Sequence, residues 1–154
     1  KIDAKVLDRA KFFSIPSESF NKSELMNSDR ITAILRKESP DLIVLAGFLL
    51  KFPEFILKAF PNKVINIHPA LLPKYGGKGM YGMLVHESVV KNKEPETGIT
   101  IHYVNENYDE GSIIFQKSFQ LSENDTAESV ASRIHELEYE FFPKVIEEIL
   151  KKDK

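Results

Sequence analysis

The feature that most limits the fold is an unbroken apolar run, Leu42-Ile-Val-Leu-Ala46, which follows the helix-breaking Ser39-Pro40-Asp41. Side chains alternate across a strand, so a run that is apolar at every position is typical of a strand buried on both faces of a parallel sheet. Val64 to His68 is a second predicted strand, and Pro69 ends it. Two such strands with helical sequence around them favour an α/β fold.

Helices and strands alternate along the whole chain. Helical spacing predicts helices over 3–13, 23–38, 53–60, 83–91 and 126–151, and further strands over 98–104 and 112–119. We therefore predict a mostly parallel open sheet with helices on both faces. A short turn, Tyr108 to Gly111, joins the last two strands, so these should form an antiparallel edge. Ligands bind beyond the carboxyl ends of strands in such sheets, which directs attention to the residues after Ala46, His68 and Val104.

Composition limits the function classes that need considering. The chain has 154 residues, 42% of them hydrophobic, which fits a single domain over residues 1–154. With no cysteine, thiol catalysis, disulfides and thiolate zinc sites are excluded. A net charge of −2 without a basic face argues against nucleic acid and anionic lipid as partners. Leu42 to Leu50 is too short to span a bilayer, so we expect a cytoplasmic protein without membrane contact.

Two familiar motifs are disfavoured. Gly77-Lys-Gly79-Met-Tyr-Gly82 spells G-x-G-x-x-G, but a proline-containing loop separates it from the preceding strand, so a glycine-rich lid or loop is favoured over a dinucleotide site. The 4 histidines fall on separate predicted elements. His135 and Glu138 could share a helical face, yet two residues do not make a metal site, and we expect no metal.

One constellation has catalytic character. Alternation puts Asn66 and His68 on the same face at the carboxyl end of a predicted strand. Asp109 lies in the turn between the last two strands, which should reach the same sheet edge, where a carboxylate would raise the pKa of His68. Each also has a plain structural interpretation: polar side chains can cap a neighbouring loop, and Asp before Gly is typical of a hairpin turn.

Together, Asn66, His68 and Asp109 suit one kind of chemistry. An amide N–H and an imidazolium can stabilise a developing oxyanion, and a carboxylate can orient the ring and stabilise its charge. None of the three has to act as a nucleophile. We therefore predict direct transfer of an acyl group to an amine supplied by the second substrate.

The motifs carry a resemblance over nearly the whole chain. Ile65-Asn-Ile-His-Pro-Ala-Leu-Leu-Pro-Lys74 resembles the N-I-H-P-S-L-L-P segment of the folate-dependent formyltransferases. Segments 44–48, 98–104 and 108–111 occur in that family's order and spacing. The resemblance implies a Rossmann-like formyltransferase fold. It also implies formyl transfer from 10-formyltetrahydrofolate, the co-substrate, to the amine of glycinamide ribonucleotide in purine biosynthesis. These two small molecules are the implied partners, and a homodimer is left open.

The resemblance also assigns roles to residues. Asn66, His68 and Asp109 fall on the family's catalytic positions, and Glu138 and Pro69 on positions that bind the substrate. The implied folate-binding residues are Leu49, Leu50, Lys51, Phe52, His102, Asn105, Glu106 and Tyr108. Without the resemblance, Glu138 would be interpreted as an ordinary helix residue, and the apolar members of the folate set as core.

The beginning of the chain departs from the family. The chain starts at Lys1 and its first predicted element is a helix, whereas the family begins with a strand and a glycine-rich phosphate loop. We expect this strand and loop to be missing here. Two alternatives stay open: a formyltetrahydrofolate hydrolase with water as acceptor, and a catalytically incomplete fragment that binds folate.

Overall fold

The computed structural model describes residues 4–27 and 29–152. The chain divides into two compact units, Lys1–Pro40 and Asp41–Lys154. The single domain expected over residues 1–154 remains a prediction. Within its described residues the first unit holds α1 (Lys5–Phe12), α2 (Lys22–Asn27) and α3 (Arg30–Glu38). The predicted helix over 3–13 is confirmed for α1, although its first residue lies outside the described ranges.

The single helix predicted over 23–38 is instead two helices. Asn21 and Glu24 cap the start of α2 reciprocally: the Asn21 N–H donates to Glu24 Oε2 at 2.8 Å and the Glu24 N–H to Asn21 Oδ1 at 2.9 Å. Leu25 and Ile31 are both buried, yet a six-residue spacing would turn them about 120° apart on one continuous helix. Two separate helices can each bury their own apolar residue, Leu25 on α2 and Ile31 on α3, which explains why the chain does not form one helix here.

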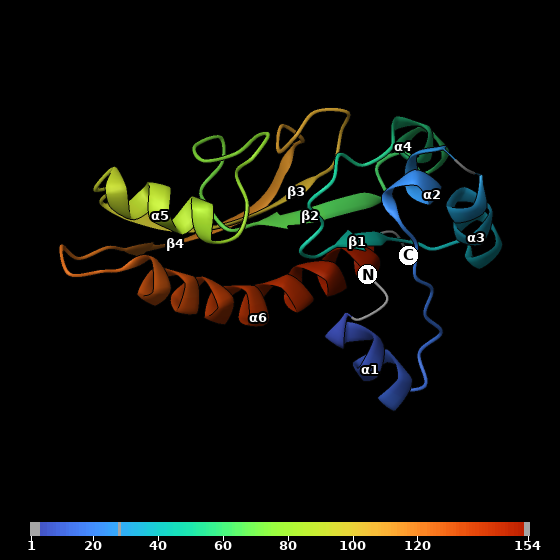
Figure 1. Ribbon diagram of the computed structural model, residues 1–154, viewed down its shortest axis with the longest axis horizontal. Coiled ribbons are helices and arrows are strands. Elements are labelled where there is room, and N and C mark those ends of the chain that lie inside the picture. The colour runs from blue at the N-terminus through green and yellow to red at the C-terminus, as the bar shows by residue number, and fades with distance from the viewer. Residues whose placement is uncertain (1–3, 28, 153–154) are drawn as a thin grey trace. The chain divides into compact units, whose positions relative to one another are not determined.

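Over residues 41–152 the second unit is a four-stranded sheet with three helices (Figure 1). Its strands are β1 (Ile43–Leu45), β2 (Val64–His68), β3 (Glu96–Tyr103) and β4 (Ile113–Gln120), in that spatial order. Its helices are α4 (Glu54–Ala59), α5 (Met83–Lys91) and α6 (Ala127–Lys152). The bounds predicted for β2 and α5 are confirmed. No helix within residues 4–27 and 29–152 has both the length and the apolar character needed to cross a bilayer.

The sheet is mixed, which corrects the expectation of a mostly parallel one. Strands β1 and β2 are parallel, whereas β2–β3 and β3–β4 are antiparallel. The antiparallel edge formed by the last two strands is confirmed. The direction of β3 was misjudged because a connection that contains a helix can return the chain either way. Here the loop after β2 folds along β3, and the Thr100 hydroxyl donates to the Ala70 carbonyl at 2.6 Å and accepts the Leu72 N–H at 3.0 Å.

Strand β1 is less buried than its apolar sequence predicts. Val44 lies in register with Ile65 of β2, yet 38% of its surface remains exposed. Among the described residues β1 is the outermost strand on its side of the sheet, so it has a neighbour along one edge only. Burial on both faces, inferred from the run Leu42–Ala46, therefore holds for Leu45 but not for Val44.

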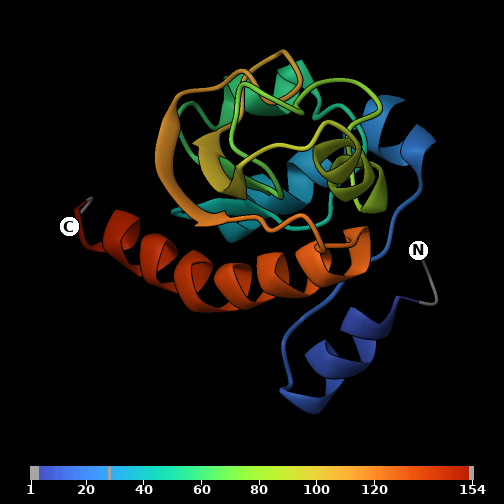
Figure 2. The ribbon, with the colours of Figure 1, turned by 90° about the vertical axis from the view of Figure 1, so that its left-hand side faces the viewer.

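Alternation along β2 separates the core from the polar face. Ile65 and Ile67 pack into the hydrophobic core with α6, so Asn66 and His68 point to the opposite face, as predicted. Figures 1 and 2 show α6 running along one side of the sheet and α4 on the other, while α5 lies past the carboxyl end of β2 and packs against α6. The buried core also includes Ile99, Ile101, Val130, Ile134, Phe142, Val145 and Ile149.

Strands β3 and β4 approach closely at Gly98, where a Cβ would overlap the carbonyl group of Lys117. We expect Gly98→Ala to lower the free energy of unfolding by about 3 kcal/mol or more, because two paired strands must separate to admit the methyl group. Gly47→Ala is the matched control: nothing lies within 4 Å of its Cβ position, and its φ of +63° limits the cost to about 1 kcal/mol of backbone strain. Urea unfolding measures both, and equal losses would contradict the packing argument.

Candidate active site

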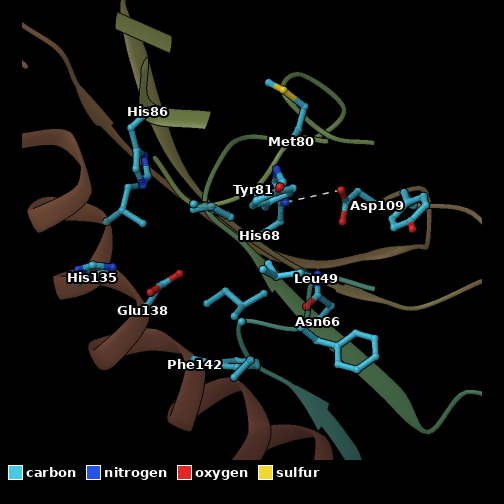
Figure 3. Close-up of a pocket in the computed structure, with 18 of the residues that line it drawn as sticks. Leu49, Asn66, His68, Met80, Tyr81, His86, Asp109, His135, Glu138 and Phe142 are labelled. Atoms are coloured by element: carbon cyan, nitrogen blue, oxygen red, sulfur yellow. Dashed lines mark ion pairs between the residues drawn. The ribbon is translucent and has the colours of Figure 1, made fainter. Parts of the chain in front are cut away.

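A cavity of about 1050 Å³, here the main cavity, opens at the carboxyl end of β2 (Figure 3). It is lined from segments 46–49, 66–69, 77–82 and 108–109, and by residues of α5 and α6. A second cavity of about 40 Å³, here the side cavity, shares Phe48, Asn66, Tyr108 and Asp109 with it. The carboxyl end of β2 thus lies between the two cavities, where its side chains can contact a ligand in either one.

The structure brings together the three residues predicted to be catalytic. His68 Nδ1 lies 3.6 Å from Asp109 Oδ2, although 41 positions separate the two in the chain. Asn66 precedes His68 on the same face of β2 and lines both cavities. Figure 3 marks the contact between His68 and Asp109 with a dashed line. An amide, an imidazole and a carboxylate therefore face one cavity.

The contacts of His68 define which ring nitrogen carries hydrogen. Nε2 lies 2.7 Å from the backbone carbonyl oxygen of Tyr75, and only a protonated nitrogen can bond a carbonyl oxygen. The neutral ring is therefore the Nε2–H tautomer. Nδ1, which faces Asp109, is the nitrogen left to accept a proton.

The pKa of His68 corrects one expectation. Burial lowers this pKa and outweighs Asp109 and the Tyr75 carbonyl, which raise it, while His102 lowers it further. Asp109 does act in the predicted direction, but only 4% of His68 is exposed, so loss of hydration dominates. At neutral pH the His68 ring is thus neutral rather than an imidazolium.

His102 orients Asn66 from the neighbouring strand. His102 Nδ1 lies 2.8 Å from the Tyr103 carbonyl oxygen, so in the neutral ring Nδ1 carries the hydrogen and Nε2 accepts. The Asn66 side-chain amide donates to this Nε2 at 3.2 Å. An amide has two N–H donors, so this bond fixes the group and leaves a second donor for a ligand.

Asp109 is held as a carboxylate. Burial raises its pKa, but the nearby His102 and His68 and the hydrogen bond from the Gly77 N–H outweigh burial and hold the pKa below its usual value. The Gly77 N–H donates to Asp109 Oδ2 at 2.9 Å, and His102 Nε2 lies 3.6 Å from Oδ1. The backbone of Asp109 is left-handed, with φ of +57°, which a short polar residue tolerates.

A second set of polar side chains, His86 of α5 with His135 and Glu138 of α6, lines another wall of the main cavity. Burial raises the pKa of Glu138, and His135 lowers it in part. Burial lowers the pKa of His86, and His135 and His68 lower it further. His86 Nδ1 has no hydrogen-bond partner among the described residues. No three His, Asp or Glu side chains within those residues are placed to hold a metal ion.

The residues implied to bind folate divide between the two cavities. Leu49 lines the main cavity and Tyr108 lines both. Glu106 lines neither cavity. Pro69, which the resemblance assigns to the substrate and not to folate, lines the main cavity. The remaining members of the set line the side cavity: Leu50, Lys51, Phe52, His102 and Asn105.

Sequence reasoning missed several parts of this site. Phe142 follows Glu138 by one helical turn, a spacing that could have placed it in the same wall. His86 lies on α5 behind the glycine-rich loop, and no pattern in the sequence relates it to α6. Tyr75 contributes a backbone carbonyl, which residue identity does not encode.

Comparison with known proteins identifies the family. Residues 1–146 match the family described as "Formyl transferase". The chain belongs to this formyl transferase family. It is 39% identical over 154 residues to "Phosphoribosylglycinamide formyltransferase" of Bacillus subtilis (strain 168), covering 97% of this chain and 76% of that protein. It is 41% identical over 131 residues to "Phosphoribosylglycinamide formyltransferase, chloroplastic" of Arabidopsis thaliana, covering 85% of this chain but only 43% of that protein.

The fold agrees with solved members. The crystal structure of phosphoribosylglycinamide formyltransferase from Bacillus halodurans matches with a TM-score of 0.87 at 30% sequence identity, covering 100% of this chain and 79% of that one. The formyltransferase fold expected from the sequence is thereby confirmed, in its mixed-sheet form.

The Asp109 carboxylate raises the pKa of His68 against the effect of burial. We therefore expect Asp109→Asn to lower this pKa further, since the amide removes the negative charge and keeps the shape. NMR titration of the His68 ring measures the change. Asp125→Asn, a substitution at the start of α6 outside both cavities, is the control and should leave the value unchanged. A His68 pKa that stays constant or rises in Asp109→Asn would contradict the assignment.

Proposed function

We propose that this protein transfers the formyl group of 10-formyltetrahydrofolate to the amine of glycinamide ribonucleotide. The observation that carries the proposal is the meeting of Asn66, His68 and Asp109 at one cavity that Glu138 also lines. At about 1050 Å³ the main cavity is at the upper end of the range for small-molecule sites, as two substrates require. The names of the relatives support the same substrate.

Asn66 would stabilise the charge that develops during transfer. When the amine attacks the formyl carbon, the formyl oxygen becomes an oxyanion, and a fixed N–H donor stabilises it more than the ground-state carbonyl. The bond to His102 at 3.2 Å already orients the Asn66 amide, so little reorganisation is needed in the transition state.

His68 would carry the proton. The attacking amine loses a proton as the new C–N bond forms, and the folate nitrogen needs one as the old C–N bond breaks. Nδ1 of the neutral ring can accept the first and return it to the second. Asp109, 3.6 Å from Nδ1, stabilises the imidazolium that exists between these steps. This replaces the expectation that His68 begins the reaction as an imidazolium.

The remaining residues would bind the two substrates. Glu138 and Pro69 would hold the ribonucleotide in the main cavity. The side cavity, at about 40 Å³, admits only the edge of a pterin ring. The folate head group would therefore bind across the boundary that Asn66, Tyr108 and Asp109 form between the cavities.

We expect Asn66→Ala and His68→Ala each to lower kcat by about 10²- to 10³-fold, with KM values changed much less. The first variant loses an oxyanion donor, and the second loses the group that transfers the proton. Loss of formyl-folate followed by absorbance, with and without glycinamide ribonucleotide, measures this. Gln120→Ala, at the far end of β4 and outside both cavities, is the control and should keep full activity. Formate release without the ribonucleotide would instead favour the hydrolase, and a wild type without turnover would favour the folate-binding fragment.

We expect Glu138→Gln to raise KM for glycinamide ribonucleotide by roughly 10- to 100-fold, because a hydrogen bond to a charged group contributes about 1.5–3 kcal/mol. KM for formyl-folate should stay within about two-fold, since Glu138 does not line the side cavity. Initial rates with each substrate varied in turn provide both constants. Equal increases in the two KM values would contradict a role specific to the ribonucleotide.

A further inference from the structure

One short backbone segment, Tyr75 to Gly77, contacts both members of the His68–Asp109 pair. The Tyr75 carbonyl oxygen lies 2.7 Å from His68 Nε2, and the Gly77 N–H donates to Asp109 Oδ2 at 2.9 Å. The position of this segment therefore determines the ring tautomer of His68 and the orientation of the carboxylate together.

The segment has a conformation that needs support. Tyr75 is left-handed, with φ of +58°, a region that residues with a Cβ rarely adopt. Gly76 packs so tightly that a Cβ there would lie 2.6 Å from Leu72 Cδ2 and 3.2 Å from Asp109 Cβ. A strained backbone of this kind persists only where surrounding contacts hold it.

The Tyr75 side chain supplies that support from outside both cavities. Its hydroxyl donates to Glu94 Oε1 at 2.8 Å and accepts a hydrogen bond from the Asn92 amide at 2.9 Å. Lys74 Nζ pairs with Glu94 Oε2 at 2.9 Å. Hydrogen bonds from Lys74 and Tyr75 hold the pKa of Glu94 below its usual value, so Glu94 is a carboxylate acceptor. Glu94 and Asn92 both lie between the end of α5 and the start of β3.

We propose that Glu94 is a positioning residue for formyl transfer, acting through the Tyr75 hydroxyl on the carbonyl that holds His68. The inference rests on the function proposed above. Neither Tyr75 nor Glu94 is among the residues that line the two cavities, so neither contacts a substrate bound there. Their loss should therefore reduce kcat through geometry rather than weaken binding.

Tyr75→Phe removes only the hydroxyl, whereas Glu94→Ala removes the acceptor of that hydroxyl together with the ion-pair partner of Lys74. We expect each to lower kcat by about 10- to 100-fold, the usual cost of a small displacement of a catalytic group, with both KM values within about two-fold. Glu94→Gln keeps an oxygen that accepts the Tyr75 hydroxyl and should retain at least about half of kcat. The double variant Tyr75→Phe with Glu94→Ala should be no worse than either alone, because both break one connection.

Glu96→Ala is the matched control, since this nearby glutamate bonds the Gln120 side chain at the sheet edge instead. It should leave kcat unchanged. Thermal unfolding of every variant, with kinetics recorded well below the transition, separates positioning from loss of folded protein. A wild-type kcat in both Tyr75→Phe and Glu94→Ala would overturn the inference, and so would a Glu94→Gln variant as impaired as Glu94→Ala.

A readout independent of activity separates this inference from the proposed function. Long-range ¹H–¹⁵N spectra of the imidazole rings report which nitrogen carries hydrogen. In the wild type we expect the Nε2–H tautomer of His68, and in Tyr75→Phe and Glu94→Ala a mixture with Nδ1–H. Unchanged tautomer populations would overturn the inference whatever the wild type catalyses, whereas absence of formyl transfer by the wild type would overturn the proposed function.

Discussion

The antiparallel register of β2 and β3 is the constraint on which the site depends. It places Asn66 opposite His102 and His68 opposite Thr100, so each polar side chain of β2 has a polar neighbour across the ladder. A slip of one residue would turn both polar groups toward α6 and the isoleucines of β2 toward the cavity. Burial of those isoleucines in the core excludes the slip. The hydrophobic effect therefore selects the arrangement in which the polar groups can act.

Burying a polar side chain costs free energy unless it has a hydrogen-bond partner, and in this site backbone carbonyl groups are the partners. His68, Thr100 and His102 are each at most 4% exposed. Each has a carbonyl partner: Tyr75 for His68, Ala70 for Thr100, and Tyr103 for His102. Two of these partners, Ala70 and Tyr75, belong to the loop that follows β2, and residues 77–82 of the same loop line the main cavity. Stability and site geometry consequently depend on the same contacts.

How far the site follows from the sequence differs from residue to residue. Asn66 and His68 could be placed on one face of β2, because strand alternation is a local property. The meeting of His68 with Asp109 followed from the expectation that both lie at one sheet edge. The direction of β3 could not be predicted, since it depends on how a long connection folds over Thr100. The role of Tyr75 could not be predicted either, because this residue contacts His68 through its backbone carbonyl and has a left-handed backbone conformation.

The lowered pKa of His68 illustrates a limit of the same kind. The motifs predicted that His68 lies near Asp109. The direction of the net change in the His68 pKa, however, depends on how completely the ring is buried, which is a property of the whole packed unit. The two opposing influences have a chemical consequence. Burial keeps the ring neutral and able to accept a proton before the reaction. Asp109, held as a carboxylate, stabilises the charged ring only after the proton arrives. A group that must accept and then return a proton requires this balance, because a strong bias toward either form would slow one of the two transfers.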